Sequence, residues 1–485
     1  GIALSIAPLN YNPAVYSQAS HLEKASGIGL TFNQGVKAGS GNITLSIANA
    51  GVAGTVVENF GVGNSVTYPT GDSILITPTA DLSVGQNYHL SYPSGAFTNL
   101  GGDVSYVGTA YTFQARTYDY QLWSWGYNTN GQLGNNTNTY YSSPVQVPGT
   151  TWISVNDSSW DGGKFSVAVK TDGTLWVWGV NEYGQLGQNQ AEAQQGDVSS
   201  PVQVPGTTWA QASRGDGFVL ATKTDGTAWS WGSNQNGALG QNQSTAISSP
   251  TQIPGTTWST TEDKIAAARY GFAAVKTDGT LWITGDNEYG LGDNTAYSTA
   301  AARSSPIQVP GTNWAHVGIQ SPKTFSATKT DGTLWMWGFN YYGNLGQNEA
   351  YSPSKKGYSS PVQVPGTTWS RVRSGSKCSF AVKTDGTLWI WGDNDKGQQG
   401  QNDTTWRSSP VQVPGTNWST NFSLSYNGNS SLAIKTNGEL WAWGENQMGD
   451  LAQNNRTKYS SPVQIPGTDW YGVGGGFVAS AVKQA

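Results

Sequence analysis

Side chains able to perform acid–base or metal chemistry are scarce in this chain of 485 residues. Its three histidines, His21, His89 and His316, are scattered far apart in the sequence. A catalytic triad needs a nucleophile, a base and an orienting group in contact, and a zinc site needs several clustered ligands. The spacing supports neither arrangement. We therefore predict no catalytic residue, no cofactor, no metal site and a structural role for each histidine.

Aspartates recur at regular intervals and could suggest a ring of carboxylates. Each stands in a T-D-G triplet, and Asn437 replaces the acid in one copy. Asp or Asn before Gly is the expected pair of a tight hairpin turn, so we predict turns. A second acidic stretch, Asp393 to Asp403, hints at a calcium loop, but its glycine comes one place early for an EF-hand. The T-D-G aspartates are Asp172, Asp225, Asp278, Asp331 and Asp385.

Composition excludes several classes of partner and setting. Charged residues make up 11% of the chain, against roughly 25% in typical soluble proteins, so the surface is polar but sparsely charged. A net charge of −5 provides no excess of positive charge for binding the phosphates of a nucleic acid. No apolar run reaches the roughly 18 to 20 residues of a membrane span. The single cysteine, Cys378, excludes an intrachain disulfide and is predicted to be a buried core residue.

The dominant feature of the chain is a sequence repeat with seven copies. Its consensus is K-T-D-G-T-L-W-x-W-G-x-N-x-x-G-Q-L-G-Q-N followed by S-S-P-V-Q-V-P-G-T-x-W. A self-similar period of this length indicates a propeller or a solenoid. Each copy contains four short alternating stretches separated by turns and shows no helical periodicity, which predicts four-stranded blades around an axis. The first tryptophans of the L-W-x-W-G units are Trp123, Trp176, Trp229, Trp282, Trp335, Trp389 and Trp441.

The two ends of the array complete each other. The first copy begins at Gln121 without the front half of its hairpin, and the last finishes at Lys483 without the back half. We predict that Trp470 to Lys483 pairs with Gln121 to Pro148 in one composite blade. That pairing would close the ring and remove two exposed sheet edges.

The first 116 residues lack the repeat and carry only strand and turn signals. Strands are predicted at Ile28–Phe32, Asn42–Ile47, Ser73–Pro78, Tyr88–Tyr92 and Ala110–Ala115, which suits a small β-sandwich. Phrases within Gly27–Leu45, Leu82–Leu90 and Ser94–Gly102 resemble bacterial Ig-like domains of S-layer and other surface proteins. The resemblance implies a spacer or attachment module in an extracellular setting. With no initiator methionine, Gly1 is expected to be a processed or truncated start.

The repeat resembles the family of the regulator of chromosome condensation. The phrases that carry the likeness are W-G-V-N-E-Y-G-Q-L-G, from Trp178 to Gly187, and W-G-F-N-Y-Y-G-N-L-G, from Trp337 to Gly346. Together, the two resemblances imply an all-β chain with an Ig-like sandwich over residues 1–116 and a seven-bladed propeller over residues 117–485. The founder's blades carry a histidine in a G-x-x-H-S phrase, and the matching positions here lack it. Nucleotide-exchange activity is therefore not carried over.

Segments that differ between copies are where we expect a ligand to bind, because loops on a rigid scaffold carry function. They lie between each L-G-Q-N turn and the next S-S-P, and repeat symmetry places all seven on one side of the disc, toward its rim. Their aromatic rings could stack on sugars, or could cover the rim and contact a neighbouring subunit in a homo-oligomer. The candidate ligand-binding residues are Tyr140, Tyr141, Tyr297, Tyr351, Tyr358, Trp406 and Tyr459.

These observations favour a non-enzymatic structural or adhesive protein outside the cell, on a phage virion or tail or on a bacterial surface. The Ig-like unit would attach to other structural proteins, and the propeller would bind a cell-surface glycan or receptor. The alternative is a secreted polysaccharide-acting hydrolase or lyase, which would need convergent, blade-specific acids or bases. Intracellular regulatory scaffolding is a third hypothesis, which the low charge and the Ig-like unit disfavour.

Overall fold

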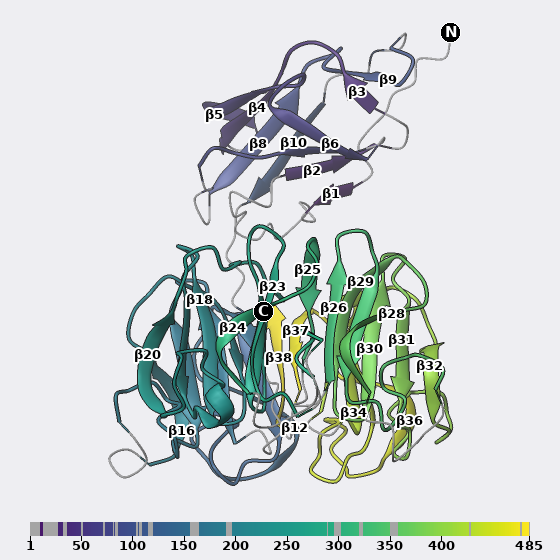
Figure 1. Cartoon of the computed structure of the whole chain (residues 1–485). Coiled ribbons are helices and arrows are strands. Elements are labelled where there is room, and N and C mark those ends of the chain that lie inside the picture. Colours follow the sequence, from purple (N-terminus) through teal and green to yellow (C-terminus); the bar gives the residue numbers. More distant parts are fainter. Residues whose placement is uncertain are drawn as a thin grey trace. The chain divides into compact units, whose positions relative to one another are not determined.

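The chain forms two compact units, Gly1–Tyr118 and Asp119–Ala485. The computed structural model (Figure 1) describes residues 10–12, 28–32, 36–49, 52–70, 73–80, 82, 86–102, 105, 109–114, 120–155, 164–190, 196–288, 290–294, 302–319, 324–349, 357–425, 428–475 and 478–484. In these ranges, no helix has the length and apolar character needed to cross a membrane.

The first unit is built from two four-stranded sheets and a two-stranded pair, with strand orders β1-β2-β7-β6, β10-β8-β4-β5 and β3-β9. Its core contains Leu30, Ile43, Leu45, Ile76 and Phe97, all buried. Strands lie at each of the five predicted places, but five others, β1, β3, β5, β6 and β9, were not predicted. The bounds are β1 (Asn10–Asn12), β2 (Ile28–Thr31), β3 (Val36–Ala38), β4 (Asn42–Asn49), β5 (Val52–Gly61), β6 (Val66–Thr70), β7 (Ser73–Ile76), β8 (Asn87–Tyr92), β9 (Phe97–Asn99) and β10 (Thr109–Gln114).

The described residues of the second unit form seven four-stranded antiparallel sheets, which are the blades of a β-propeller. The inner strands of successive blades contact one another around a central channel. From the inner to the outer strand, the bounds are β37 (Trp470–Gly474), β38 (Val478–Gln484), β11 (Tyr120–Gly126) and β12 (Tyr141–Gln146) in blade 1; β13 (Trp152–Val155), β14 (Phe165–Lys170), β15 (Leu175–Gly179) and β16 (Val198–Gln203) in blade 2; β17 (Trp209–Arg214), β18 (Phe218–Lys223), β19 (Ala228–Gly232) and β20 (Ile247–Ile253) in blade 3; β21 (Ile265–Ala268), β22 (Gly271–Val275), β23 (Leu281–Gly285) and β24 (Arg303–Val309) in blade 4; β25 (Trp314–Val317), β26 (Thr324–Lys329), β27 (Leu334–Gly338) and β28 (Tyr358–Val364) in blade 5; β29 (Trp369–Ser374), β30 (Cys378–Lys383), β31 (Leu388–Gly392) and β32 (Arg407–Gln412) in blade 6; and β33 (Trp418–Leu424), β34 (Ser430–Lys435), β35 (Leu440–Gly444) and β36 (Tyr459–Ile465) in blade 7.

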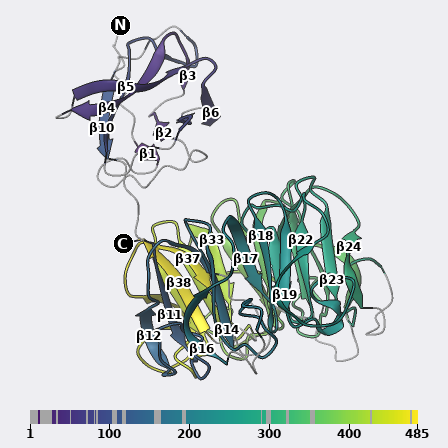
Figure 2. The same cartoon turned by 90° about the vertical axis from the view of Figure 1, so that its left-hand side faces the viewer.

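Blade 1 joins the two ends of the unit. Strand β38 pairs with β11 in register from Tyr120 opposite Gln484 to Gly126 opposite Val478. Figure 2 shows β37 and β38, in yellow, beside β11 and β12. The N–H of Asn454 in blade 7 also donates to the carbonyl of Ser142 in blade 1, at 2.8 Å. The seam between the ends therefore has the same contacts as the seams between other blades.

The repeated motif is explained by contacts within and between blades. In blade 2, the Lys170 ammonium lies 4.5 Å from the rings of both Trp152 and Trp176, a cation–π arrangement that recurs around the ring. The second tryptophan, Trp178, is buried and donates from Nε1 to the carbonyl of Gln132 in the preceding blade, at 2.8 Å. Thr284, which replaces this tryptophan in blade 4, keeps the bond through its hydroxyl, 3.2 Å from the carbonyl of Ala238.

Antiparallel strand order gives the propeller two distinct faces. The T-D-G turns and the P-G-T-x-W links between blades lie on one face, which we call the turn face; the N-x-x-G loops and the rim loops lie on the other, the loop face. In blade 2, Asp172 Oδ1 accepts bonds from the Thr174 N–H at 2.9 Å and the Thr174 hydroxyl at 2.6 Å. The T-D-G aspartates are turn residues, as predicted.

Candidate functional site

The candidate chemical residues do not converge. His316 is partly buried on β25, and burial lowers its pKa to about 4; His21 lies outside the described residues. Cys378 is fully buried, as predicted, and its thiol lies 3.0 Å from the carbonyl of Gly428. Burial raises the pKa of this thiol well above its usual range. Among the residues that the structure describes, His, Cys, Asp and Glu form no group of three that could hold a metal ion.

The rim aromatics are spread over several blades and do not share a pocket. Tyr297 and Tyr351 lie outside the described residues. Tyr141, Tyr358 and Tyr459 begin the outer strands β12, β28 and β36 at the loop face. Tyr358 and Tyr459 pack partly buried against the cores of their blades, and the Tyr358 hydroxyl donates to Glu349 at 2.6 Å. These two rings therefore have structural contacts.

Tyr140 and Trp406 lie in small aromatic clusters on the loop face. The ring of Tyr140 is 4.9 Å from that of Tyr127. Trp406 donates from Nε1 to Asp395 at 2.6 Å, and its ring lies 5.5 Å from Tyr342 of the neighbouring blade. Of the partner rings, Tyr342 stands within an N-x-x-G loop and Tyr127 directly precedes one, and no role was predicted from the sequence for either position.

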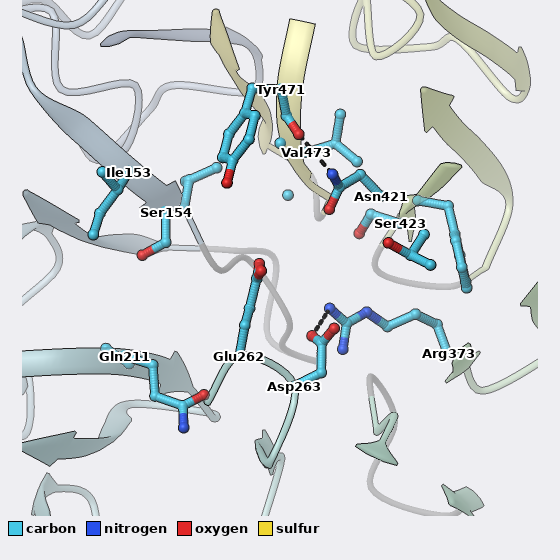
Figure 3. Close-up of a pocket in the computed structure, with 16 residues that line it drawn as sticks. Ile153, Ser154, Gln211, Glu262, Asp263, Arg373, Asn421, Ser423, Tyr471 and Val473 are labelled. Carbon is cyan, nitrogen blue, oxygen red and sulfur yellow. Dashed lines mark hydrogen bonds and ion pairs between the residues drawn. The ribbon is translucent and has the colours of Figure 1, made fainter. Parts of the chain in front are cut away.

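A polar pocket lies at the axis of the propeller (Figure 3). Its empty volume is about 670 Å³, part of which is open to solvent. Inner strands or the loops before them contribute from six blades, including Ser154, Gln211, Glu262, Arg373 and Tyr471. Glu262 and Tyr471 are exposed: 67% of the Glu262 side chain and 47% of residue Tyr471 are accessible to solvent. The pocket is therefore accessible at the turn-face end of the inner strands.

An insertion in blade 4 forms one wall of this pocket. Strand β21 starts at Ile265, seven positions after Trp258, whereas most inner strands start at the equivalent tryptophan. The extra segment places Asp263, with a positive φ of 58°, inside the channel. Its carbonyl accepts a bond from the Val317 N–H of blade 5 at 3.0 Å, which holds the loop in place. The chain has thus built a loop into the axis at one blade.

Asp263 pairs with two arginines of β29, across the channel in blade 6. Arg373 lies 2.6 Å from Asp263 Oδ1, and Arg371 contacts Oδ2. All three side chains are nearly covered, with Asp263 3%, Arg371 9% and Arg373 16% exposed. Arg371 also donates to the carbonyl of Thr420 in blade 7 at 2.9 Å. The loop therefore ties together blades that are not adjacent.

The charged groups at the floor of the pocket differ from those at its mouth. Burial lowers the pKa of Arg371 to about 10, with Glu262 opposing the shift, and burial also lowers the pKa of Arg373. Arg371 thus stays charged at neutral pH, and both guanidiniums are paired with the buried Asp263. The exposed carboxylate of Glu262 points into the open part of the pocket, with Tyr471 and Asn421 on the opposite wall (Figure 3). No nucleophile and base are paired among the described residues that line it. This arrangement suits binding.

Sequence comparison identifies relatives of the propeller. The model of the RCC1-like domain family matches residues 121–482. The ultraviolet-B receptor UVR8 of Arabidopsis thaliana is 28% identical over 378 residues, covering 74% of this chain and 80% of that protein. The mitochondrial RCC1 domain-containing protein RUG3 of the same plant is 27% identical over 352 residues, covering 67% and 77%. The chain also matches the human E3 ubiquitin-protein ligase HERC2, but over only 6% of its length.

Solved structures share the fold. Prp20p from Saccharomyces cerevisiae superimposes with a TM-score of 0.63 and 16% identity, covering 76% of this chain and 92% of that one. Human WBSCR16 gives a TM-score of 0.64 at 17% identity, covering 76% and 99%. These values confirm the all-β propeller architecture. RCC1-like propellers are in general non-enzymatic regulators.

The expected setting of the protein was wrong. The relatives are eukaryotic RCC1-family proteins, regulators or receptors, which contradicts a phage virion or tail, an adhesin, an extracellular location and virion or surface structural proteins as partners. Low charge and the lack of disulfides are properties of the propeller scaffold. The same scaffold can serve in many cellular locations, so these properties do not indicate where the protein acts.

The family model spans all seven blades and more than half of the chain. The matched residues include the tryptophans, turns and loops that hold neighbouring blades together. This chain belongs to the RCC1-like domain family.

Proposed function

We propose that this chain is a non-enzymatic protein-recognition propeller that binds its partner on the turn face, over the axial pocket. The observation that carries the proposal is the blade 4 insertion, which departs from the repeat to place Glu262 and the buried Asp263 at the axis. Scaffold residues repeat in every blade, whereas this loop serves one blade only. A feature that breaks the symmetry at an accessible concave site is a good candidate for recognition.

Related structures support a role in protein binding. The study of Prp20p describes its binding to Gsp1p and histones, and a second structure shows Kap60 bound to yeast RCC1 (Prp20). Those partners belong to those proteins. For this chain, the net charge of −5 and the polar lining of the pocket favour a protein partner over nucleic acid.

The proposal is tested by comparing two exposed tyrosines on opposite faces. Tyr471 lines the axial pocket, whereas Tyr183 is 42% exposed in an N-x-x-G loop of the loop face. The tagged full chain and the variants Tyr471→Ala and Tyr183→Ala would be used to capture partners from extracts of the source cells. We expect a partner retained by wild type and Tyr183→Ala and lost by Tyr471→Ala. A partner set unaffected by Tyr471→Ala but lost with Tyr183→Ala would place recognition on the other face.

Two further assignments remain proposals. The packed sheets of the first unit support an Ig-like fold for residues 1–116, in front of a propeller over residues 117–485. On the loop face, Tyr140 and Trp406 remain candidate ligand contacts, because each lies in an aromatic cluster that is partly open to solvent.

A further inference from the structure

The axial pocket presents opposite charges at different depths. The covered charges, Asp263, Arg371 and Arg373, are already paired with one another. Glu262 is 67% exposed and forms an ion pair with the Arg371 guanidinium at 3.7 Å, for which an incoming cation would compete from the solvent side. A ligand entering from solvent therefore meets a carboxylate before it meets the guanidiniums.

The wall opposite Glu262 is aromatic and rich in hydrogen-bonding groups. Tyr471 presents its ring and hydroxyl toward the pocket (Figure 3), and the ring of Tyr120 supports it at 5.5 Å. Asn421 is held beside it by a 2.7 Å bond from its Nδ2 to the carbonyl of Tyr471. A carboxylate facing a tyrosine ring suits a cation with several N–H donors, because the charge pairs with the acid and the plane can stack on the ring.

We propose that the axial pocket takes the basic side chain of a partner protein, held between Glu262 and Tyr471. This inference rests on the proposed function and names the chemical group that is recognised. An anion would have to pass Glu262 and compete with Asp263 for guanidiniums that are already paired. Arginine fits better than lysine, because its planar fork can bond a carboxylate and stack on an aromatic ring at once.

The test uses the full chain and two peptides of the same shape. The tripeptide acetyl-Gly-Arg-Gly-amide would be titrated against its uncharged isostere acetyl-Gly-citrulline-Gly-amide, with binding followed by calorimetry at low salt. We expect saturable binding of the arginine peptide and at least about tenfold weaker binding of the citrulline peptide, since a charged hydrogen bond is lost. Raising the ionic strength should weaken binding of the arginine peptide.

Variants locate the site. Glu262→Gln should weaken binding of the arginine peptide by about tenfold or more. Its fold should be unaffected, because the side chain is mostly exposed. Glu182→Gln, an exposed acid of the loop face, is the matched control and should bind as wild type does. Three results would overturn the inference. They are equal binding of both peptides, unchanged binding of the arginine peptide to Glu262→Gln, and no saturable binding of the arginine peptide up to about 20 mM.

Two results separate this inference from the proposed function. A partner that is lost with Tyr471→Ala but retained by Glu262→Gln would keep turn-face recognition and reject a basic anchor. Saturable binding of inorganic phosphate in competition with the arginine peptide would show that the arginines of the floor govern the pocket, and would also overturn it. Loss of the same partner with both variants would support both proposals.

Discussion

Replacing Asp450 by asparagine should make the propeller more stable at alkaline pH. Asp450 occupies the place held by Gln132, Gln185 and Gln398 in other copies. Its backbone carbonyl accepts a hydrogen bond from Trp125 Nε1 of blade 1 at 2.8 Å. Its Oδ1 is buried without a described hydrogen-bond partner. Burial raises its pKa from 3.8 to about 7, with Glu445 adding to the rise and the Met448 amide opposing it. The seam between blades 7 and 1 thus contains a carboxyl that, in the folded chain, stays mostly protonated below about pH 7.

The sign and size of the effect follow from linkage. Because the folded state holds the proton more tightly than the unfolded state, stability falls as the pH rises from about 4 to about 7 and is then constant. The slope is about 1.4 kcal/mol per pH unit, so the cost that accrues above pH 5 is at most about 3 kcal/mol. Asp450 as a whole is only partly buried, and solvent screening reduces this to an expected value of about 2 kcal/mol.

The assay is urea unfolding followed by tryptophan fluorescence at pH 5 and pH 8. Residues 1–116 contain no tryptophan, so the signal reports the propeller. We subtract the free energy of unfolding of wild type from that of Asp450→Asn at each pH. This difference should be about 2 kcal/mol larger at pH 8 than at pH 5, which means that the variant gains stability relative to wild type as the pH rises. Comparing the two pH values cancels any pH-independent cost of the substitution. The exposed Asp469, changed to Asn, should show no such difference. Equal pH dependence of wild type and Asp450→Asn would refute the reasoning.

Three further outcomes are expected. Asp263→Asn removes the carboxylate that Arg371 and Arg373 share and should lower the unfolding free energy by about 3 kcal/mol in urea, while a loss below about 0.5 kcal/mol would contradict the pairing. Thr284→Val removes two buried bonds, to the Ala238 carbonyl and from the Phe272 N–H, each 3.2 Å long, and should cost about 1 to 3 kcal/mol in the same assay; an unchanged midpoint would show that neither bond contributes. Deleting residues 478–485 removes β38 from blade 1 and should abolish the cooperative thermal transition of the propeller, and a truncated chain that melts like the full one would argue against the pairing of β38 with β11.

Local sequence signals were sufficient for the scaffold. The T-D-G turn is specified by Asp172 and Thr174 within three residues, and the alternating L-W-x-W segment places Trp176 and Trp178 on the same side of their strand. Because every copy repeats these signals, their period alone identified the propeller. In the first unit, β5 was missed because Val52–Gly61 contains an internal glycine and lacks clear alternation.

The axial site could not be predicted in the same way. Glu262, Arg371 and Tyr471 are far apart in the sequence, and only closure of the ring brings them together. A length signal was available but was not confined to blade 4: the segments from Trp258 to Gly271 and from Trp152 to Phe165 are both longer than their equivalent from Trp209 to Phe218. The rim loops vary most between copies and were therefore predicted to bind a ligand, yet Tyr358 and Tyr459 pack against their own blades. The copies differ both at the blade 4 insertion and at the rim loops. Only the structure showed that the insertion lines a pocket whereas Tyr358 and Tyr459 pack against their blades.

The most direct test of turn-face recognition is photo-crosslinking from defined positions of the full chain. A photoreactive phenylalanine analogue would be placed at position 471 in one sample and at position 183 in another, in the cells that produce the protein. If the partner binds on the turn face, we expect one protein to be crosslinked repeatedly from position 471 and not from position 183. Crosslinks that form from position 183 alone, or from neither position, would contradict it.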